Sequence, residues 1–306
     1  MKIATMATGG IGGFLAVRLS KTGHQVATIA RGAHLDAIRE HGLVLEAFDG
    51  THRIKPWIAT SDPKDVGEVD AIIFGVKGDT LESAARSCKP MIGANTIVIP
   101  FLNGVEASER LAEILPEANV GNGVAQISTT IAAPGLIRQT GEFNRFIFAE
   151  RDSRPSSRID LLRQAINEAG SSAPPTNDIE RDLWLKFVLF SAVSGVTAAA
   201  RCTMRDIAEN EHLTGLFKAI VSETAALGKA RNVALPETIE ADIWSAAKAL
   251  PPAMRASTAI DLENGRPLEI EWISGAVSRL SQAAGLQAPV NRTIYSLLTP
   301  YRHGFK

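Results

Sequence analysis

Hydrophobic residues in the first half of the chain fall in short runs, and most runs are followed by a stretch with helical periodicity. Two of the runs, within 69–77 and 95–104, are almost continuously apolar, which is typical of strands buried on both faces of a sheet. Strands are expected at 2–7, 24–31, 69–77 and 95–104, with helices ending near Lys21 and spanning about 33–42, 80–88 and 105–115. This alternation predicts an α/β fold with a Rossmann-like, doubly wound parallel sheet.

A second kind of strand signal interrupts this order. Residues 42–60 predict a hairpin around Asp49–Gly50, because Asp-Gly is a strong turn dipeptide. The stretch 120–149 is rich in β-forming residues, with turns expected at Pro134–Gly135 and at Gly141. A helix over about 155–169 then closes the first half of the chain.

The second half has a different pattern. Residues 171–177 combine small residues with two prolines, which indicates a boundary, and strand signals nearly vanish after it. Helices are expected at 178–200, 212–232, 236–248, 252–264, 267–284 and 289–301. We therefore predict a Rossmann-like domain over residues 1–172 and a C-terminal all-helical domain over residues 173–306.

The composition of the chain argues against several classes of protein. A length of 306 residues suits about two domains, and 45% hydrophobic with 21% charged residues is ordinary for a soluble protein. The net charge of −1 gives no reason to expect nucleic acid or a membrane surface as a partner. No apolar run approaches a membrane span, and the strand pattern at the start argues against a secretory signal. Two cysteines favour a reducing cytoplasm, and six histidines without ligand spacing predict no metal.

The glycines after the first strand resemble a phosphate-binding loop. The motif consists of Ala7, Thr8, Gly9, Gly10, Ile11 and Gly12. In G-x-G-x-x-G the second glycine lets the backbone approach a pyrophosphate and the third lets the helix pack closely, but alanine takes the first position here. Alanine is a mild replacement if its φ is negative. The strand before and the helix after favour a dinucleotide site over a purely structural turn.

The end of the second strand bears on the choice of cofactor. An NAD site usually has an acidic residue there, which binds the ribose 2′-hydroxyl. This chain has Arg31 and no acid, and a guanidinium suits a 2′-phosphate. NADP(H) is the expected cofactor, and the alternative is that Arg31 is a solvated surface residue.

Two later strands also end in polar residues. Lys77 and Asn103 follow the apolar runs, and ligands of doubly wound sheets bind beyond the carboxyl ends of strands. We expect both residues near the cofactor, although either could simply face water at a strand end.

A lysine in the helical half breaks an apolar segment. Lys186 lies within "DLWLKFVLF", where Leu183 precedes it and Leu189 and Phe190 follow it on the same helix face. Such a lysine either extends to the surface or sits at an internal site with a shifted pKa. Glu269 is the candidate partner, on a predicted helix face shared with Trp272 and Ile273, whereas Glu271 is expected to face solvent. Together with Ser257, this set suits carbonyl reduction, in which an ammonium delivers the proton.

At this point the chain resembles the ketopantoate reductase (2-dehydropantoate 2-reductase) family over nearly its whole length. The resemblance rests on the glycine loop, "ARGAHLDAIREHGL", "VKGDTLESA", "LNGVEASERL", "LWLKFV", "STAIDLENGRPLEIEWISGAVSRL" and "APVNRTIYSLL". It implies NADPH as cofactor, Lys186 as catalytic lysine and proton donor, and Glu269 as catalytic carboxylate. It also implies that Lys77 and Asn103 lie near nicotinamide and substrate, and that Ser257 contacts the substrate. The family includes dimers, so the resemblance allows for a homodimer.

The chain departs from the family at the expected substrate-binding positions. Family members usually carry asparagines four and eight residues after the catalytic lysine, followed by proline, where this chain has Phe190, Ser194 and Gly195. A methionine and a glutamine of the family pattern are replaced by Thr258 and Ile260. A site that loses a hydrogen-bonding amide also loses part of its selectivity for a polar substrate.

Three functions follow from these features. The first is NADPH-dependent reduction of a 2-oxo acid, with ketopantoate as the foremost substrate and pantothenate biosynthesis as the pathway. The second is a related dehydrogenase acting on a less polar 2-oxo acid or ketone, which Phe190 and Ser194 favour. The third is a sensor that binds NADP(H) without chemistry, and the retention of both Lys186 and Glu269 argues against it.

Overall fold

The computed structural model describes residues 1–305 and divides into two compact units. The first comprises Met1–Leu102 with Glu106–Ile179, and the second comprises Asn103–Val105 with Glu180–Lys306. The boundary therefore lies after residue 172, within the first turn of a helix that begins at Ile179. The short segment Asn103–Val105 belongs to the helical unit.

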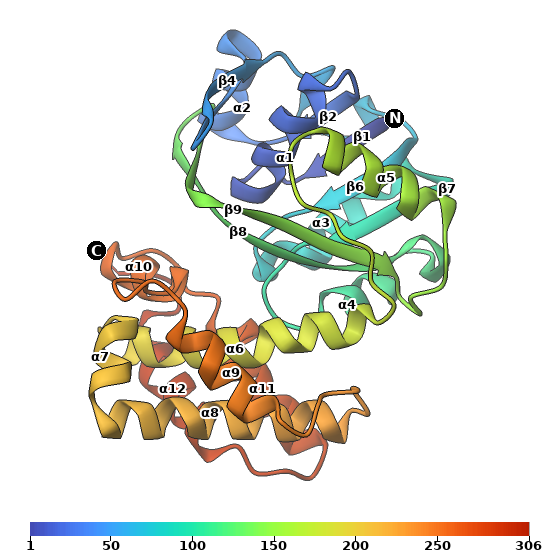
Figure 1. The fold of residues 1–306 in the computed structure, drawn as a ribbon. Helices are drawn as coiled ribbons and strands as arrows, with labels where there is room; N and C mark the ends of the chain where they lie inside the picture. The colour runs from blue at the N-terminus through green and yellow to red at the C-terminus, as the bar shows by residue number, and fades with distance from the viewer. Residues whose placement is uncertain (306) are drawn as a thin grey trace. The chain divides into compact units, whose positions relative to one another are not determined.

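The first unit contains the predicted parallel sheet, with strand order β5-β2-β1-β6-β7 (Figure 1). Its strands are β1 (Lys2–Met6), β2 (Gln25–Ile29), β5 (Ile58–Thr60), β6 (Val69–Phe74) and β7 (Ile92–Pro100). Its helices are α1 (Gly10–Lys21), α2 (Gly32–His41), α3 (Leu81–Cys88), α4 (Ala107–Ala112) and α5 (Ser157–Glu168). In register, Ile3 of β1 lies between Val26 of β2 and Ala71 of β6. The strand order changes direction at β1, so the doubly wound topology is confirmed.

The β-rich segments form a second sheet, which the sequence pattern did not predict as a separate layer. Its order is β4-β3-β9-β8, built from β3 (Leu43–Ala47), β4 (Gly50–Ile54), β8 (Gly121–Ala133) and β9 (Leu136–Glu150). The hairpin around Asp49–Gly50 and the turn at Gly135 are both present. Gly141 has a positive φ where β9 loses register with β8, so it marks a bulge rather than a chain reversal.

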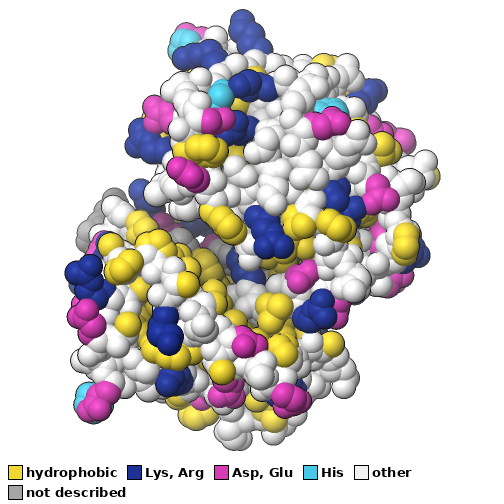
Figure 2. Space-filling model, viewed as in Figure 1, with side chains coloured by type: hydrophobic (Ala, Val, Ile, Leu, Met, Phe, Trp, Pro, Cys, Tyr) yellow, Lys and Arg dark blue, Asp and Glu magenta, His cyan; other side chains and the backbone are white. Residues whose placement is uncertain are grey.

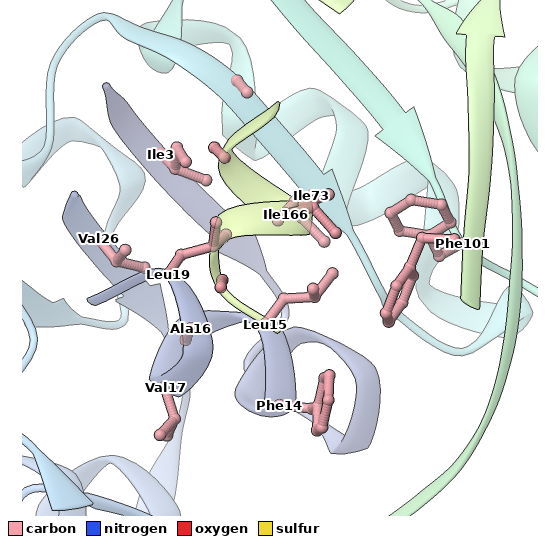
Figure 3. Packing of buried hydrophobic residues seen from close by; sticks show 14 of the residues in the cluster. Ile3, Phe14, Leu15, Ala16, Val17, Leu19, Val26, Ile73, Phe101 and Ile166 are labelled. Atoms are coloured by element: carbon pink, nitrogen blue, oxygen red, sulfur yellow. The ribbon is translucent and has the colours of Figure 1, made fainter. Parts of the chain in front are cut away.

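Helix α1 explains why a second sheet is needed. Every residue from Gly12 to Leu19 is buried, so this helix has no face left for solvent. It contacts β1 and β2 of the parallel sheet and also β3, β4, β8 and β9. Figure 3 shows Phe14, Leu15 and Leu19 of this helix among apolar side chains of the same core. The second sheet therefore covers the apolar surface of α1 that the parallel sheet cannot reach.

The described residues of the second unit form helices and connecting loops without a strand, as predicted. Its helices are α6 (Ile179–Ala199), α7 (Met204–Glu209), α8 (Glu211–Ala230), α9 (Ile239–Lys248), α10 (Ser257–Glu263), α11 (Ser274–Ala283) and α12 (Pro289–Leu298). Helix α7 was missed, although Thr203 and Asp206 form a capping box at its start. The helix expected at 252–264 begins only at Ser257, because the carbonyls of Pro252 and Met254 accept hydrogen bonds from the start of α7.

Helix α6 is the one helix of residues 1–305 that is long and apolar enough to cross a membrane. Two thirds of its most apolar window (67%) is buried inside the protein, which is typical of a core helix. On the face shown in Figure 2, basic and acidic side chains are interspersed, in keeping with the net charge of −1.

Candidate active site

The glycine loop joins β1 to α1 in the geometry of a nucleotide-binding turn. A Cβ atom on Gly12 would lie 2.1 Å from the carbonyl oxygen of Ala7, so only glycine lets the helix pack on the loop. A Cβ on Gly10 would lie 2.6 Å from the carbonyl oxygen of Thr129 in β8. Gly9 is more open, with the carbonyl oxygen of Gly75 as its nearest neighbour at 3.8 Å. Backbone atoms therefore leave no room for a side chain at Gly10 or Gly12, whereas Gly9 has free space around it.

The alanine at the first motif position fits this turn. Among residues 1–305, the non-glycine residues with positive φ are Ser153, Arg201 and Asn232, so Ala7 has the negative φ that lets alanine stand at the first motif position. Gly9 is the N-cap of α1 and provides no side-chain cap for the first turn. The amide groups and dipole of that turn favour an anion, which suits a dinucleotide pyrophosphate. The residues present therefore fit NADP(H).

The other expected cofactor residues lie at the carboxyl ends of neighbouring strands. Arg31 follows β2, is exposed, and forms the N-cap of α2. Lys77 follows β6 and is also exposed. Because β2 and β6 flank β1 in the sheet, both side chains start from the edge that carries the glycine loop. Their roles toward the cofactor stay predictions.

The helical unit brings Lys186, Asn103 and Glu269 together. The Lys186 ammonium donates a hydrogen bond to Oδ1 of Asn103 over 3.2 Å. The Asn103 amide nitrogen in turn donates to Oε2 of Glu269 over 3.4 Å. The lysine and the carboxylate are thus linked through an amide, an arrangement that the helical periodicity of the sequence could not predict.

Lys186 and Asn103 border a small pocket. Its wall is formed by Asn103, Gly104, Leu183, Lys186, Phe187, Phe190 and Ile273. Most of the wall is therefore apolar, and Lys186 and Asn103 supply its polar side chains. The Lys186 ammonium lies 5.4 Å from the centre of the Phe190 ring, within the range of a cation–π contact.

Burial determines the electrostatics of the lysine. Desolvation lowers the pKa of Lys186 from its ordinary value of 10.5 to about 8, while the nearby Glu269 carboxylate raises it and opposes the shift. The ammonium is thus a much stronger acid than a lysine in water. A proton donor with a pKa close to the working pH is the most effective kind of general acid.

The Asn103–Gly104 pair depends on glycine. Gly104 has a φ of +92°, and a Cβ at this position would lie 2.6 Å from the carbonyl oxygen of Trp272. Only glycine allows this turn to pack against the segment that follows Glu269. The sequence predicted Asn103 at the end of an apolar strand, but neither the turn at Gly104 nor its contact with Trp272.

The carboxylates are placed differently from the prediction. Glu269 does not lie on a helix face, because it caps the short 3₁₀ segment Ile270–Trp272 and α11 begins only at Ser274. Glu271 was expected to face solvent, but it accepts hydrogen bonds from Arg302, over 2.6 Å, and from the Tyr295 hydroxyl. Glu271 is thus a structural partner of the C-terminal helix.

Two expected substrate residues do not border this pocket. Ser194 is 2% exposed and donates a hydrogen bond to the Thr258 hydroxyl over 2.7 Å. Ser257 is exposed at the start of α10. Phe190, by contrast, forms part of the wall. Among residues 1–305, no cluster of three or more His, Cys, Asp or Glu side chains could hold a metal.

A glycine loop on a doubly wound sheet and a lysine–amide–carboxylate set on a helical unit define a dinucleotide-dependent oxidoreductase. Residues 3–153 match the family model for ketopantoate reductase PanE/ApbA, and residues 178–302 match the model for the C-terminal part of that family. A 2-dehydropantoate 2-reductase of Mesorhizobium japonicum is 29% identical over 323 residues, which cover 97% of each chain.

Solved structures agree with this match. The crystal structure of a PanE/ApbA family ketopantoate reductase from Ralstonia eutropha JMP134 has a TM-score of 0.89 and 29% identity, covering 99% of this chain and 98% of that one. A D-mandelate dehydrogenase solved with NADH and anilino(oxo)acetate shares the fold, with a TM-score of 0.89, 22% identity and coverage of 99% and 98%. The chain belongs to the ketopantoate reductase family, which uses NADPH, and it is an NADP-dependent oxidoreductase.

Proposed function

We propose that this protein reduces a 2-oxo acid to a 2-hydroxy acid with NADPH, and that 2-dehydropantoate (ketopantoate), reduced to pantoate, is its foremost substrate. The observation that carries the proposal is the Lys186 ammonium at the wall of a pocket, held by Asn103 and desolvated enough to lower its pKa to about 8. Lysine in this state can bind a carbonyl oxygen and release a proton to it.

Each residue of the set has a distinct role. NADPH, when bound, supplies the hydride that reduces the carbonyl carbon. Lys186 stabilises the negative charge that grows on the carbonyl oxygen and then donates its proton to that oxygen. Asn103 orients the ammonium through its Oδ1 atom, and Glu269 holds the Asn103 amide from the other side. The Glu269 charge also favours the protonated form of Lys186, because it opposes the effect of burial on the pKa of that lysine.

A second candidate substrate class is supported by Phe190. Its ring borders the pocket beside Leu183 and Phe187, and Ser194 is engaged with Thr258. Neither residue offers an amide to the hydroxyl or carboxylate of a polar substrate, so the wall suits a 2-oxo acid with an apolar side chain. The fold accommodates such compounds, since one structural neighbour is named as a D-mandelate dehydrogenase. We propose a cytoplasmic location for either activity, because both cysteines are free and buried.

The test is NADPH oxidation, followed by absorbance, with ketopantoate and a panel of 2-oxo acids of increasing side-chain apolarity. Efficient turnover of ketopantoate supports the first substrate, and preference for an apolar or aromatic 2-oxo acid supports the second. Lys186→Ala should retain NADPH binding and lose turnover of whichever substrate is active. Binding of NADPH without turnover of any compound would reject both reductase proposals and favour the sensor.

A further inference from the structure

A histidine outside the substrate pocket connects separate parts of the nucleotide-binding unit. His34 lies on α2, one turn after Arg31, and is partly buried. Its Nε2 atom lies 2.9 Å from the carbonyl oxygen of Thr8 in the glycine loop. Its Nδ1 atom lies 3.0 Å from the backbone nitrogen of Gly135, in the turn between β8 and β9. One imidazole therefore contacts the loop and the second sheet at once.

The partners determine the protonation state of this ring. The Gly135 N–H can only donate, so Nδ1 must be an unprotonated acceptor. The Thr8 carbonyl can only accept, so Nε2 must carry the proton. The neutral Nε2–H tautomer satisfies both bonds. Burial lowers the pKa of His34, and the hydrogen bond to Thr8 opposes this shift, so the neutral form prevails above its ordinary value of 6.5.

The bond to Thr8 fixes the orientation of a whole peptide unit. The peptide group is planar and trans, so the Thr8 carbonyl and the Gly9 N–H point in opposite directions. A carbonyl turned toward His34 therefore directs the Gly9 N–H away from it. The remaining polar groups of Thr8 are also held: its N–H donates to the Ile29 carbonyl over 2.8 Å, and its hydroxyl lies 2.8 Å from that of Thr5.

The same histidine anchors the start of α2. Arg31 is the N-cap of that helix, and the ring of His34 ties its first turn to Thr8. The loop is further confined by the β8–β9 hairpin, since the Thr129 backbone leaves no room for a side chain on Gly10. His34 therefore holds both the glycine loop, which is expected to bind the pyrophosphate, and the start of α2, where Arg31 is expected to bind the 2′-phosphate.

We propose that His34 is a positioning residue for the cofactor: it holds the Thr8–Gly9 peptide unit in the orientation that binds the pyrophosphate and docks the Arg31 end of α2 on the same loop. The proposal rests on the NADPH dependence of the proposed function, but it concerns nucleotide binding, which does not depend on the substrate. Its readout is the dissociation constant of NADPH, measured by fluorescence titration of the full-length protein.

Two amide substitutions separate the two hydrogen bonds. His34→Gln places an N–H donor near the position of Nε2 and retains the Thr8 bond, whereas His34→Asn places an acceptor near Nδ1 and retains only the Gly135 bond. We expect His34→Gln to bind NADPH within about threefold of the wild type. His34→Asn and His34→Ala should each bind about tenfold more weakly, which corresponds to about 1.4 kcal/mol.

The affinity for NADH is the control that separates an effect on the glycine loop from an effect on Arg31. Because the pyrophosphate is common to both nucleotides, His34→Asn should weaken NADH as well as NADPH, whereas Arg31→Ala should weaken NADPH alone. Equal effects of the Gln and Asn variants would overturn the proposal, as would an unchanged affinity for NADH in His34→Asn. If His34→Ala unfolds, the Gln and Asn variants still decide the question. Failure of the proposed substrates leaves these titrations intact, so the two proposals fail independently.

Discussion

The lowered pKa of Lys186 predicts a descending limb in the pH profile of the reaction. The lysine must be protonated to act as an acid, so kcat/KM should fall as the pH rises through its pKa of about 8. The expected loss is about twofold at pH 8, about tenfold at pH 9 and about a hundredfold at pH 10. A lysine at the ordinary value of 10.5 would show almost no loss below pH 9.5.

Neutralising Glu269 tests the origin of this pKa. The Glu269 charge raises the pKa of Lys186 against the effect of burial, so Glu269→Gln should move the descending limb to lower pH. Glu271→Gln is the matched control, because that carboxylate lies two residues away and is held by Tyr295 and Arg302. The assay is initial-rate NADPH oxidation at saturating NADPH between pH 6 and 10.

Three results would refute this reasoning. A profile without a descending limb below pH 10 would exclude a desolvated lysine as the acid. A limb that moves to higher pH in Glu269→Gln would reverse the sign of the electrostatic argument. Equal shifts in the Glu269 and Glu271 variants would show that the effect comes from net charge rather than from the contact through Asn103.

Three further substitutions have defined outcomes. Arg31→Ala should cut the preference for NADPH over NADH by about tenfold or more, from the loss of a charge-assisted bond, and an unchanged ratio of dissociation constants would reject its role. Gly12→Ala places a Cβ 2.1 Å from the Ala7 oxygen, so thermal unfolding should occur at a lower temperature and NADPH binding should be lost. Phe190→Asn introduces an amide into the pocket wall, and kcat/KM for ketopantoate should rise relative to an aromatic 2-oxo acid; a constant ratio would show that this position does not select the substrate.

Local sequence patterns determined most of the secondary structure and the order of the two domains. Apolar runs, glycine positions and helical periodicity predicted the parallel sheet, the nucleotide loop and the helical second half, because each depends on residues close together in the chain. The role of Gly12 in helix packing could be predicted from its position in the motif alone, because the third glycine of such a loop is where the helix packs closely on the strand. The family was likewise evident in motifs distributed over the whole chain.

Other features depended on residues far apart in sequence. The second sheet covers the side of α1 that the parallel sheet cannot reach, since every residue from Gly12 to Leu19 of that helix is buried, and its strands come from segments at 43–54 and 121–150. Glu269 was singled out as an isolated carboxylate, yet its link to Lys186 passes through Asn103, which lies 166 residues earlier in the chain. No local pattern predicted the role of His34, because its partners come from the glycine loop and from a turn 101 residues away.

The sequence by itself therefore determined which elements form and which residue types are available for chemistry. The tertiary structure decided which distant residues meet, because it alone brought Asn103 and Glu269 to Lys186 and removed water from around its ammonium. The physical reason is that propensity and periodicity act over a few residues, whereas desolvation and hydrogen-bond pairing arise only when distant segments pack together.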